Sequence, residues 1–168
     1  MLLPTDTDLR HIADQIGQKM CLKGLYIVTA ESCTGGWIAK TITDLPGASA
    51  WFDTGFVVYS DRAKHALLGI DPSVLANHGA VSAQAAKALT AGALARSPAD
   101  IAVGVTGIAG PSGGSEKKPV GTVWISWQKR DCAPTAVCFH FDGNRNAVRC
   151  QSVAAAFDGV LRIIDSSC

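Results

Sequence analysis

The sequence predicts an α/β fold in which helices cover both faces of a mixed β-sheet. Short apolar runs rich in β-branched residues alternate with segments of helical periodicity, and a short polar turn joins the last two apolar runs. Hydrophobic residues make up 48% of the chain and charged residues 17%, as is typical of a globular protein whose central strands are shielded from water. A length of 168 residues suits one core, so we expect a single domain over residues 1–168.

The first expected elements are a helix and a buried strand. Apolar residues recur at helical spacing from Leu9 to Met20, with Asp6 or Thr7 as the expected cap. Gly24 is expected to end this helix. The run LYIVTA at residues 25–30 is short, apolar and partly β-branched, which predicts a strand.

The middle of the chain continues the alternation. Two glycines at 35–36 permit a tight turn before a helix with Trp37, Ile38 and Ile42 on one face. The run FVVY at 56–59 predicts the next strand.

Three helices are expected to follow. Ser60 or Asp61 can cap a helix that runs to Gly69, and Asp71-Pro72 can start another. Ser82 can cap a long Ala/Leu helix that Ser97-Pro98 closes.

The last part of the chain predicts a third strand at 101–105, a glycine-rich loop at 107–118 and an antiparallel strand pair at 120–127 and 135–141. A closing helix ends near Ile164, with its apolar face marked from Val153 onward.

Charge and apolar patterning exclude several classes of partner. Fifteen basic and fourteen acidic residues give a net charge of +1, which provides no broad field for nucleic acid or anionic lipid. No stretch approaches the ~20 apolar residues of a membrane span, and residues 1–10 do not resemble an export signal. We therefore expect a cytoplasmic protein without a nucleic-acid or membrane partner.

The cysteines and histidines show no metal-binding spacing, so we expect no metal. Without an export signal the cysteines are expected to be reduced thiols. The six cysteines are Cys21, Cys33, Cys132, Cys138, Cys150 and Cys168.

Three polar loops follow the predicted parallel strands, where open α/β sheets bind ligands. In the first, Glu31-Ser32-Cys33-Thr34-Gly35-Gly36, free N–H groups at a helix start would favour a phosphate or an oxyanion. The alternative is that Ser32 or Thr34 only caps the helix.

Lys64 lies in the helix after the second strand and can point back toward the same end of the sheet. Partial desolvation would disfavour its charged form, so it could accept a proton from Ser32 directly or through Tyr59. The alternative is an ordinary solvated lysine.

The third loop begins at Thr106. Its glycines, Gly107 and Gly110, allow close approach of a ligand, although a surface turn without a ligand would have the same composition. Arg145, near the start of the last helix, could bind a phosphate, and Arg149 shares its face. The alternative is that both pair with Asp142 or Asp158.

Taken together, the motifs resemble the CinA C-terminal domain family, in particular its stand-alone nicotinamide mononucleotide amidohydrolases. The resemblance spans about residues 8–164. The matching motifs are AESCTGG at 30–36, VVYS at 57–60, HGAVS at 78–82, GIAGPSGG at 107–114 and KPVGTV at 118–123.

The resemblance implies a three-layer α/β/α sandwich with a mixed, mostly parallel five-stranded sheet. It also implies a homodimer without a metal or cofactor that hydrolyses the carboxamide of nicotinamide mononucleotide in pyridine nucleotide salvage. Ser32 matches the nucleophile, Tyr59 and Lys64 the helper residues, and Thr106 and Arg145 the substrate pocket.

Three alternatives remain open at this point. Cys33 could be the nucleophile instead of Ser32, since thiols are easily activated at a helix start. The chain could also be a nucleotide-binding or regulatory module without chemistry, or a structural interaction protein.

Overall fold

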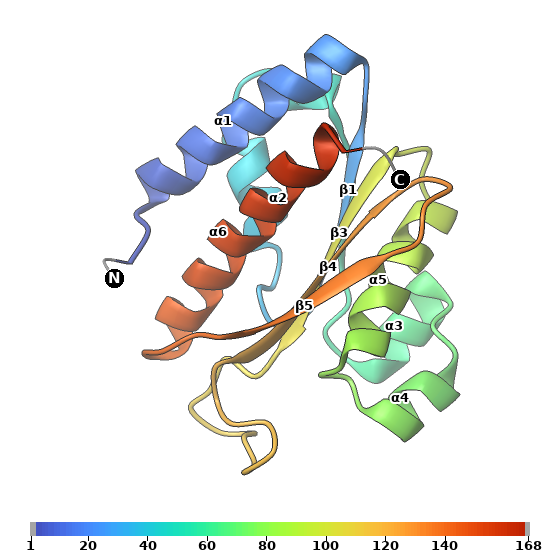
Figure 1. The fold of residues 1–168 in the computed structure, drawn as a ribbon, viewed down its shortest axis with the longest axis vertical. Coiled ribbons are helices and arrows are strands. Elements are labelled where there is room, and N and C mark those ends of the chain that lie inside the picture. The colour runs from blue at the N-terminus through green and yellow to red at the C-terminus, as the bar shows by residue number, and fades with distance from the viewer. Residues whose placement is uncertain (1–2, 167–168) are drawn as a thin grey trace.

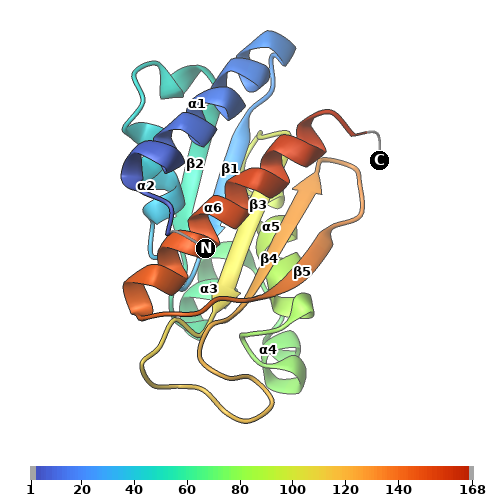
Figure 2. The same cartoon turned by 60° about the vertical axis from the view of Figure 1, so that its left-hand side comes forward.

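The computed structural model describes residues 3–166 and consists of three layers with a β-sheet in the middle (Figures 1 and 2). The strand order is β2-β1-β3-β4-β5. The strands are β1 (Ile27–Glu31), β2 (Phe52–Val57), β3 (Ile101–Gly107), β4 (Thr122–Lys129) and β5 (Thr135–His140). β1 is parallel to β2 and β3, and β4 is antiparallel to both neighbours. Only β4 therefore runs against the others, so the predicted mixed, mostly parallel sheet is confirmed.

Helices cover both faces of the sheet, as predicted. One face carries α1 (Asp6–Lys23), α2 (Trp37–Thr43) and α6 (Arg145–Ile164). The other carries α3 (Asp61–Leu68), α4 (Pro72–His78) and α5 (Ala83–Ala95). A short 3₁₀-helix, η1 (Ala48–Ala50), precedes β2.

Successive residues of the central strands point into two separate cores, as the pleat of a strand requires. In β3, Ile101 and Val103 face the core under α1, α2 and α6, whereas Ala102 faces the core under α5. At Gly104, an added Cβ would lie 3.0 Å from the Cβ of Leu89. The absence of a side chain there lets α5 pack closely against the sheet.

Helix ends follow local signals. Ser60 caps α3, Gly69 ends it, and Asp71 caps α4, as predicted. Gly24 ends α1 as predicted, but the cap of α1 is Thr5 rather than Asp6 or Thr7. Thr5 and Asp8 form a reciprocal capping box, which satisfies two backbone N–H groups at once.

The largest error in the predicted elements concerns β2. This strand begins at Phe52 and ends at Val57, four residues before the start and two before the end of the predicted range 56–59. Its side chains alternate between half-buried and exposed, so Asp53 faces solvent while Phe52 pairs with Ile27 of β1. Residues 58–59 leave the sheet and start the loop toward α3.

The cysteines only partly match the prediction. Cys21, Cys33, Cys138 and Cys150 are free thiols. Cys132 is disulfide-bonded, so the expectation that every cysteine is reduced was wrong. The expectation for Cys168 lies outside the described residues. Among residues 3–166, no helix is long and apolar enough to cross a membrane.

Candidate active site

The carboxyl ends of β1, β2 and β3 lie at the same edge of the sheet because these strands are parallel (lower end in Figure 1). The three polar loops expected from the sequence start there. The N-terminal turn of α6 lies at this edge as well. Ligand sites of open α/β sheets are found at such edges.

Ser32 is the first residue after β1 and is held by backbone hydrogen bonds. Its N–H donates to the carbonyl of Val105 at 2.9 Å, and its carbonyl accepts from Gly35 N–H at 3.1 Å. The side chain is nearly buried, with 7% of the residue exposed. Its hydroxyl makes no hydrogen bond to another described residue, so it is free to react with a ligand.

Glu31 stabilises the start of α2 from inside the protein. Its buried carboxylate accepts from the N–H groups of Gly36, Ile38 and Ala39 at 3.0, 3.1 and 2.9 Å. These donors are therefore not available to an anion. The N-cap of α2 is Gly36, with no side-chain cap, so the alternative role of Ser32 or Thr34 as a helix cap was wrong.

Lys64 is buried at the same edge, with 1% of the residue exposed. Its Nζ donates to the carbonyl of Tyr59 at 2.9 Å and to Asp61 Oδ1 at 3.3 Å. Val58, the residue before Tyr59, donates its N–H to the carbonyl of Glu31 at 2.8 Å. The amine is thus bound to the loop that follows β2, and the alternative of a solvated lysine was wrong.

The described residues show no hydrogen bond between Ser32 Oγ and Lys64 Nζ. The Tyr59 side chain is also directed elsewhere, since its hydroxyl accepts from Arg145 Nη2 at 3.3 Å. Lys64 therefore contacts Tyr59 through its backbone carbonyl. Transfer of a proton between Ser32 and Lys64 requires a change of hydrogen-bond partner at the amine.

Arg145 connects the second and third loops. Besides Tyr59, it binds the carbonyl of Gly110 through Nη1 at 2.9 Å. Within residues 3–166, neither Arg145 nor Arg149 forms an ion pair with Asp142 or Asp158, so that alternative was wrong.

The third loop is fixed to the connection between α4 and α5. Thr106 is buried, and its hydroxyl donates to the carbonyl of Ala80 at 2.7 Å. Lys118, the first residue of the KPVGTV motif, had no predicted role, and its Nζ donates to the carbonyls of His78 and Val81 at 3.1 and 2.7 Å. These bonds limit the movement of the loop from both ends.

The two loop glycines have local reasons to be glycine. At Gly107, an added Cβ would lie 2.7 Å from Cγ2 of Val123 on the neighbouring strand. Gly110 has a φ of 83°, which glycine adopts without strain. The close packing at Gly107 and the positive φ at Gly110 explain these glycines without a ligand, and neither feature prevents a ligand from binding.

Cys33 and Thr34 complete the first loop. Burial raises the pKa of the Cys33 thiol to about 12, and neither the hydrogen bond from its own backbone N–H nor the charges of Arg149 and Arg145 offset this effect. The thiol is therefore neutral near pH 7, which argues against Cys33 as the nucleophile. Thr34 is fully buried, and its Oγ1 has no hydrogen-bond partner among the described residues.

Arg149 was noted in the sequence only as a neighbour of Arg145. In the structure, its Nε and Nη2 donate to the carbonyls of Cys33 and Thr34 at 3.2 and 2.7 Å. The four-residue spacing to Arg145 was the available signal, but the target of the guanidinium depends on how α6 packs.

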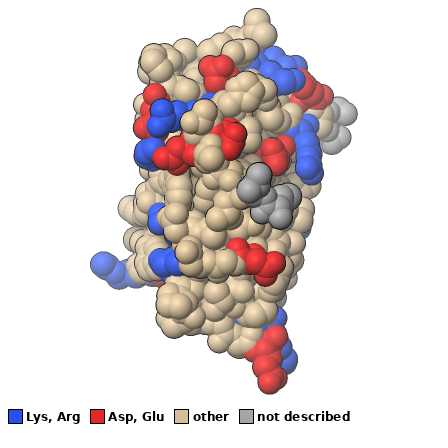
Figure 3. Space-filling model, turned by 90° about the vertical axis from the view of Figure 1, so that its left-hand side faces the viewer, with Lys and Arg blue, Asp and Glu red and all other residues tan. Residues whose placement is uncertain are grey.

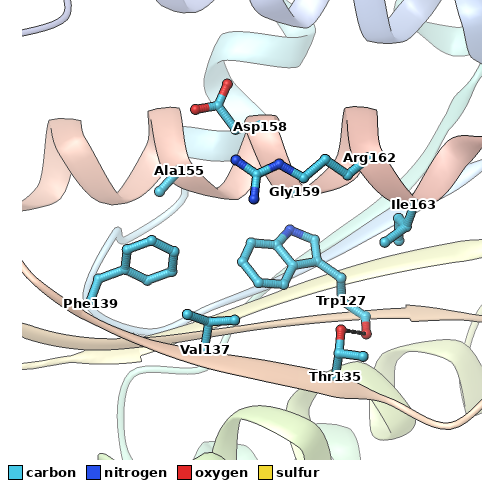
Figure 4. A pocket seen from close by; sticks show the side chains of 9 residues that line it. All are labelled: Trp127, Thr135, Val137, Phe139, Ala155, Asp158, Gly159, Arg162 and Ile163. Atoms are coloured by element: carbon cyan, nitrogen blue, oxygen red, sulfur yellow. Dashed lines mark hydrogen bonds between the residues drawn. The ribbon is translucent and has the colours of Figure 1, made fainter.

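A separate hollow of about 320 Å³ lies between β5 and α6 (Figure 4). Its floor is formed by Trp127, Val137 and Phe139, with Asp158 and Arg162 on the helix side. It contains no nucleophile next to a base. The face in Figure 3 carries charges of both signs interspersed, and residues 3–166 contain no cluster of three His, Cys, Asp or Glu suited to a metal.

Comparisons with known proteins give a consistent result. Residues 9–164 match the CinA C-terminal domain. The chain is 47% identical over 160 residues to the nicotinamide-nucleotide amidohydrolase PncC of Escherichia coli strain K12, covering 90% of this chain and 92% of the relative. It is 52% identical over 117 residues to a putative competence-damage inducible protein of Symbiobacterium thermophilum, covering 70% of this chain but 28% of that longer protein.

A similar fold has also been solved. The crystal structure of the competence/damage inducible protein CihA from Agrobacterium tumefaciens superposes with a TM-score of 0.91 at 40% identity and 99% coverage of both chains.

Proposed function

The chain belongs to the CinA C-terminal domain family, and we propose that it hydrolyses the carboxamide of nicotinamide mononucleotide to nicotinic acid mononucleotide and ammonia. The strongest support is that relatives named as nicotinamide-nucleotide amidohydrolases match nearly the whole chain at 45–48% identity. The unpaired hydroxyl of Ser32, at the edge where the loops converge, provides a nucleophile for this reaction.

In the proposed mechanism, Ser32 attacks the carboxamide carbon while Lys64 accepts the hydroxyl proton, directly or through Tyr59. The amine then returns the proton to the departing nitrogen, so that ammonia leaves and an acyl-enzyme remains. Water resolves this intermediate. For the first transfer, Lys64 must be a neutral amine and must exchange its bond to the Tyr59 carbonyl or to Asp61 for one that accepts the Ser32 proton.

Substrate contacts are divided among the loops. Arg145 and the loop from Thr106 through Gly107 and Gly110 are proposed to bind the phosphate. Glu31 is proposed to act indirectly, by holding the start of α2, because its carboxylate is buried and fully hydrogen-bonded.

The oxyanion is proposed to be bound by backbone N–H groups of the first loop, Cys33, Thr34, Gly35 and Gly36. The amides of Gly35 and Gly36 already donate to Ser32 and Glu31, which favours the first two residues as donors.

The proposed setting is pyridine nucleotide salvage in the cytoplasm, by a homodimer that needs no metal or cofactor. The net charge of +1 supports the absence of a nucleic-acid partner. Sedimentation of the purified protein would test the dimer, since a mass near the 17.5 kDa of one chain would contradict it.

The function is tested by incubating the purified protein with nicotinamide mononucleotide and measuring ammonia. We expect turnover by the wild type and complete loss in Ser32→Ala, with an unchanged circular dichroism spectrum and unfolding midpoint. Cys33→Ala is the matched control in the same turn and should keep most of the activity. Full turnover by Ser32→Ala would exclude the serine mechanism.

The second candidate function is a non-catalytic nucleotide-binding or regulatory module. It is favoured by the longer competence-damage inducible relative, of which the matching region is only 28%. Such a module would bind the mononucleotide in calorimetry without forming ammonia or acid product over long incubation.

A further inference from the structure

Arg149 makes two parallel hydrogen bonds to the backbone directly after the proposed nucleophile. Its Nε and Nη2 donate to consecutive carbonyls, those of Cys33 and Thr34. The guanidinium also lies over the ring of Trp37, with its Cζ 5.1 Å from the ring centroid. A guanidinium with two hydrogen bonds and a cation–π contact has little freedom to move.

These bonds orient the peptide groups of the turn. In a planar trans peptide, the C=O and the N–H point in opposite directions. The Thr34 carbonyl points to Arg149, so Gly35 N–H points away, where it donates to the carbonyl of Ser32 at 3.1 Å. That bond fixes the Ser32 carbonyl and, by the same geometry, the direction of Cys33 N–H.

Cys33 N–H makes no hydrogen bond to another described residue, and it is the amide that immediately follows the proposed nucleophile. The amide of Ser32 itself already donates to Val105. The Cys33 N–H hydrogen-bonds to the thiol of its own residue, a weak acceptor that an oxyanion can replace. A donor next to the attacking oxygen is what a tetrahedral intermediate requires, provided that the donor is held in place before the reaction.

From this geometry we infer that Arg149 is a positioning residue, which orients Cys33 N–H toward the oxyanion through the Thr34, Gly35 and Ser32 peptide groups. The oxyanion in this inference rests on the proposed function, whereas the orientation of the turn by Arg149 does not. Arg149 acts from the side of the turn opposite to this amide and is not assigned a contact with substrate.

Arg145 has a different role although it lies one helical turn earlier. It is exposed and contacts Tyr59 and Gly110, the residues of the second and third loops. Arg149 is half-buried, and within residues 3–166 its hydrogen bonds and ring contact are to the first loop and Trp37. We therefore expect substitution of Arg145 to affect substrate binding and substitution of Arg149 to affect the chemical step.

The first test is the kinetics of ammonia release. We expect Arg149→Ala and Arg149→Lys to lower kcat by about ten- to a hundredfold with little change in KM, since loss of an oxyanion donor costs about 10²–10³. Arg145→Ala should mainly raise KM. Arg162→Ala, on the far end of the same helix, is the matched control and should match the wild type. Added guanidinium ion, too dilute to unfold the protein, should restore part of the kcat of Arg149→Ala.

The second test does not depend on the substrate. A fluorophosphonate reacts with an activated serine: the Ser32 Oγ–P bond forms, the P–F bond breaks, fluoride leaves, and the hydroxyl proton passes to a base. The phosphoryl oxygen needs the same N–H donor as the oxyanion. Mass spectrometry of the Ser32 peptide should show labelling that is slower in Arg149→Ala and Arg149→Lys but not in Arg162→Ala.

The outcomes separate the two proposals. If the wild type does not hydrolyse the mononucleotide but labels at Ser32 in an Arg149-dependent manner, the substrate proposal fails and the role of Arg149 stands. If both Arg149 variants fold, judged by circular dichroism, and retain wild-type kcat and labelling rate, the inference is wrong. A rise in KM alone, without rescue by guanidinium, would also overturn it.

Discussion

Two nucleophilic side chains, Ser32 and Cys33, lie next to each other in the same turn. A cysteine attacks as a preformed thiolate, and burial opposes formation of that thiolate by raising the pKa of Cys33 to about 12. A serine is used with a base in any case. The environment of the turn therefore favours the hydroxyl.

This difference predicts the pattern of thiol alkylation. Near pH 8, Cys33 stays in its neutral thiol form because burial raises its pKa to about 12. We expect iodoacetamide to modify the exposed Cys21 of the folded protein and to leave Cys33 intact, with ammonia release unchanged. Peptide mass spectrometry measures this, and Cys33 should react once the protein is unfolded in urea. Rapid alkylation of Cys33 in the folded protein, with parallel loss of activity, would contradict the prediction.

At the level of single residues, the sequence was sufficient to identify candidate catalytic side chains from their position after a strand. It was not sufficient to predict which residues they contact. Ser32 could be selected because it lies just after a predicted strand, and Lys64 because it lies in the first turn of the helix that follows the next strand. The contact from Arg149 to Thr34 joins residues 115 positions apart and depends on how α6 packs across the sheet. No local pattern contains that information.

At the level of elements, β1 and α2 are joined by one buried carboxylate. Glu31 is the last residue of β1, and it accepts hydrogen bonds from the first turns of α2. The strand end, the Ser32 turn and the helix are thus held as one unit.

The Glu31→Gln variant tests this connection between β1 and α2. An amide places an NH₂ donor against the N–H of Ala39 or of Gly36 and Ile38, so we expect the free energy of unfolding to fall by about 1–3 kcal/mol. Ammonia release should fall too, because the turn loses its support. Urea denaturation measures the first effect. Glu116→Gln, in an exposed part of the third loop, is the control and should be neutral; equal stability of the two variants would refute the role of Glu31.

Prediction of the elements succeeded where capping or glycine signals were local, as at Gly24, Ser60 and Asp71. It failed at β2, because Asp53 and Thr54 are polar and resemble a loop when considered alone. These residues form a strand because Phe52 through Val57 pair with β1. Such pairing is a tertiary effect that overrides local propensity.

For the whole molecule, three exposed carboxylates link stability to acid pH. Hydrogen bonds lower the pKa below the ordinary value of 3.8 for Asp8 (from Thr5), Asp71 (from Ser73) and Asp165 (from Lys19 and Lys23). A lowered pKa in the folded state means stabilisation that is present above the ordinary value and is lost as pH falls through the folded value.

We therefore expect the urea midpoint to decline as pH drops below about 4. Asp71→Asn removes one of the three groups and should make this decline shallower, whereas Asp142→Asn, whose carboxylate has no hydrogen bond among the described residues, should not. If the urea midpoint of Asp71→Asn falls with decreasing pH as steeply as that of the wild type, the Asp71 cap does not contribute to the pH dependence of stability.

The helix that supplies Arg145 and Arg149 follows every strand of the sheet in the chain, while the turn it holds comes shortly after the first strand. During translation, the serine leaves the ribosome long before the two guanidinium groups. A nascent chain whose last helix is still inside the exit tunnel has its nucleophile but lacks the bonds from Arg149 to the Cys33 and Thr34 carbonyls. The proposed hydrolysis therefore reaches its full rate only when synthesis has passed Arg149 and the tunnel has released it.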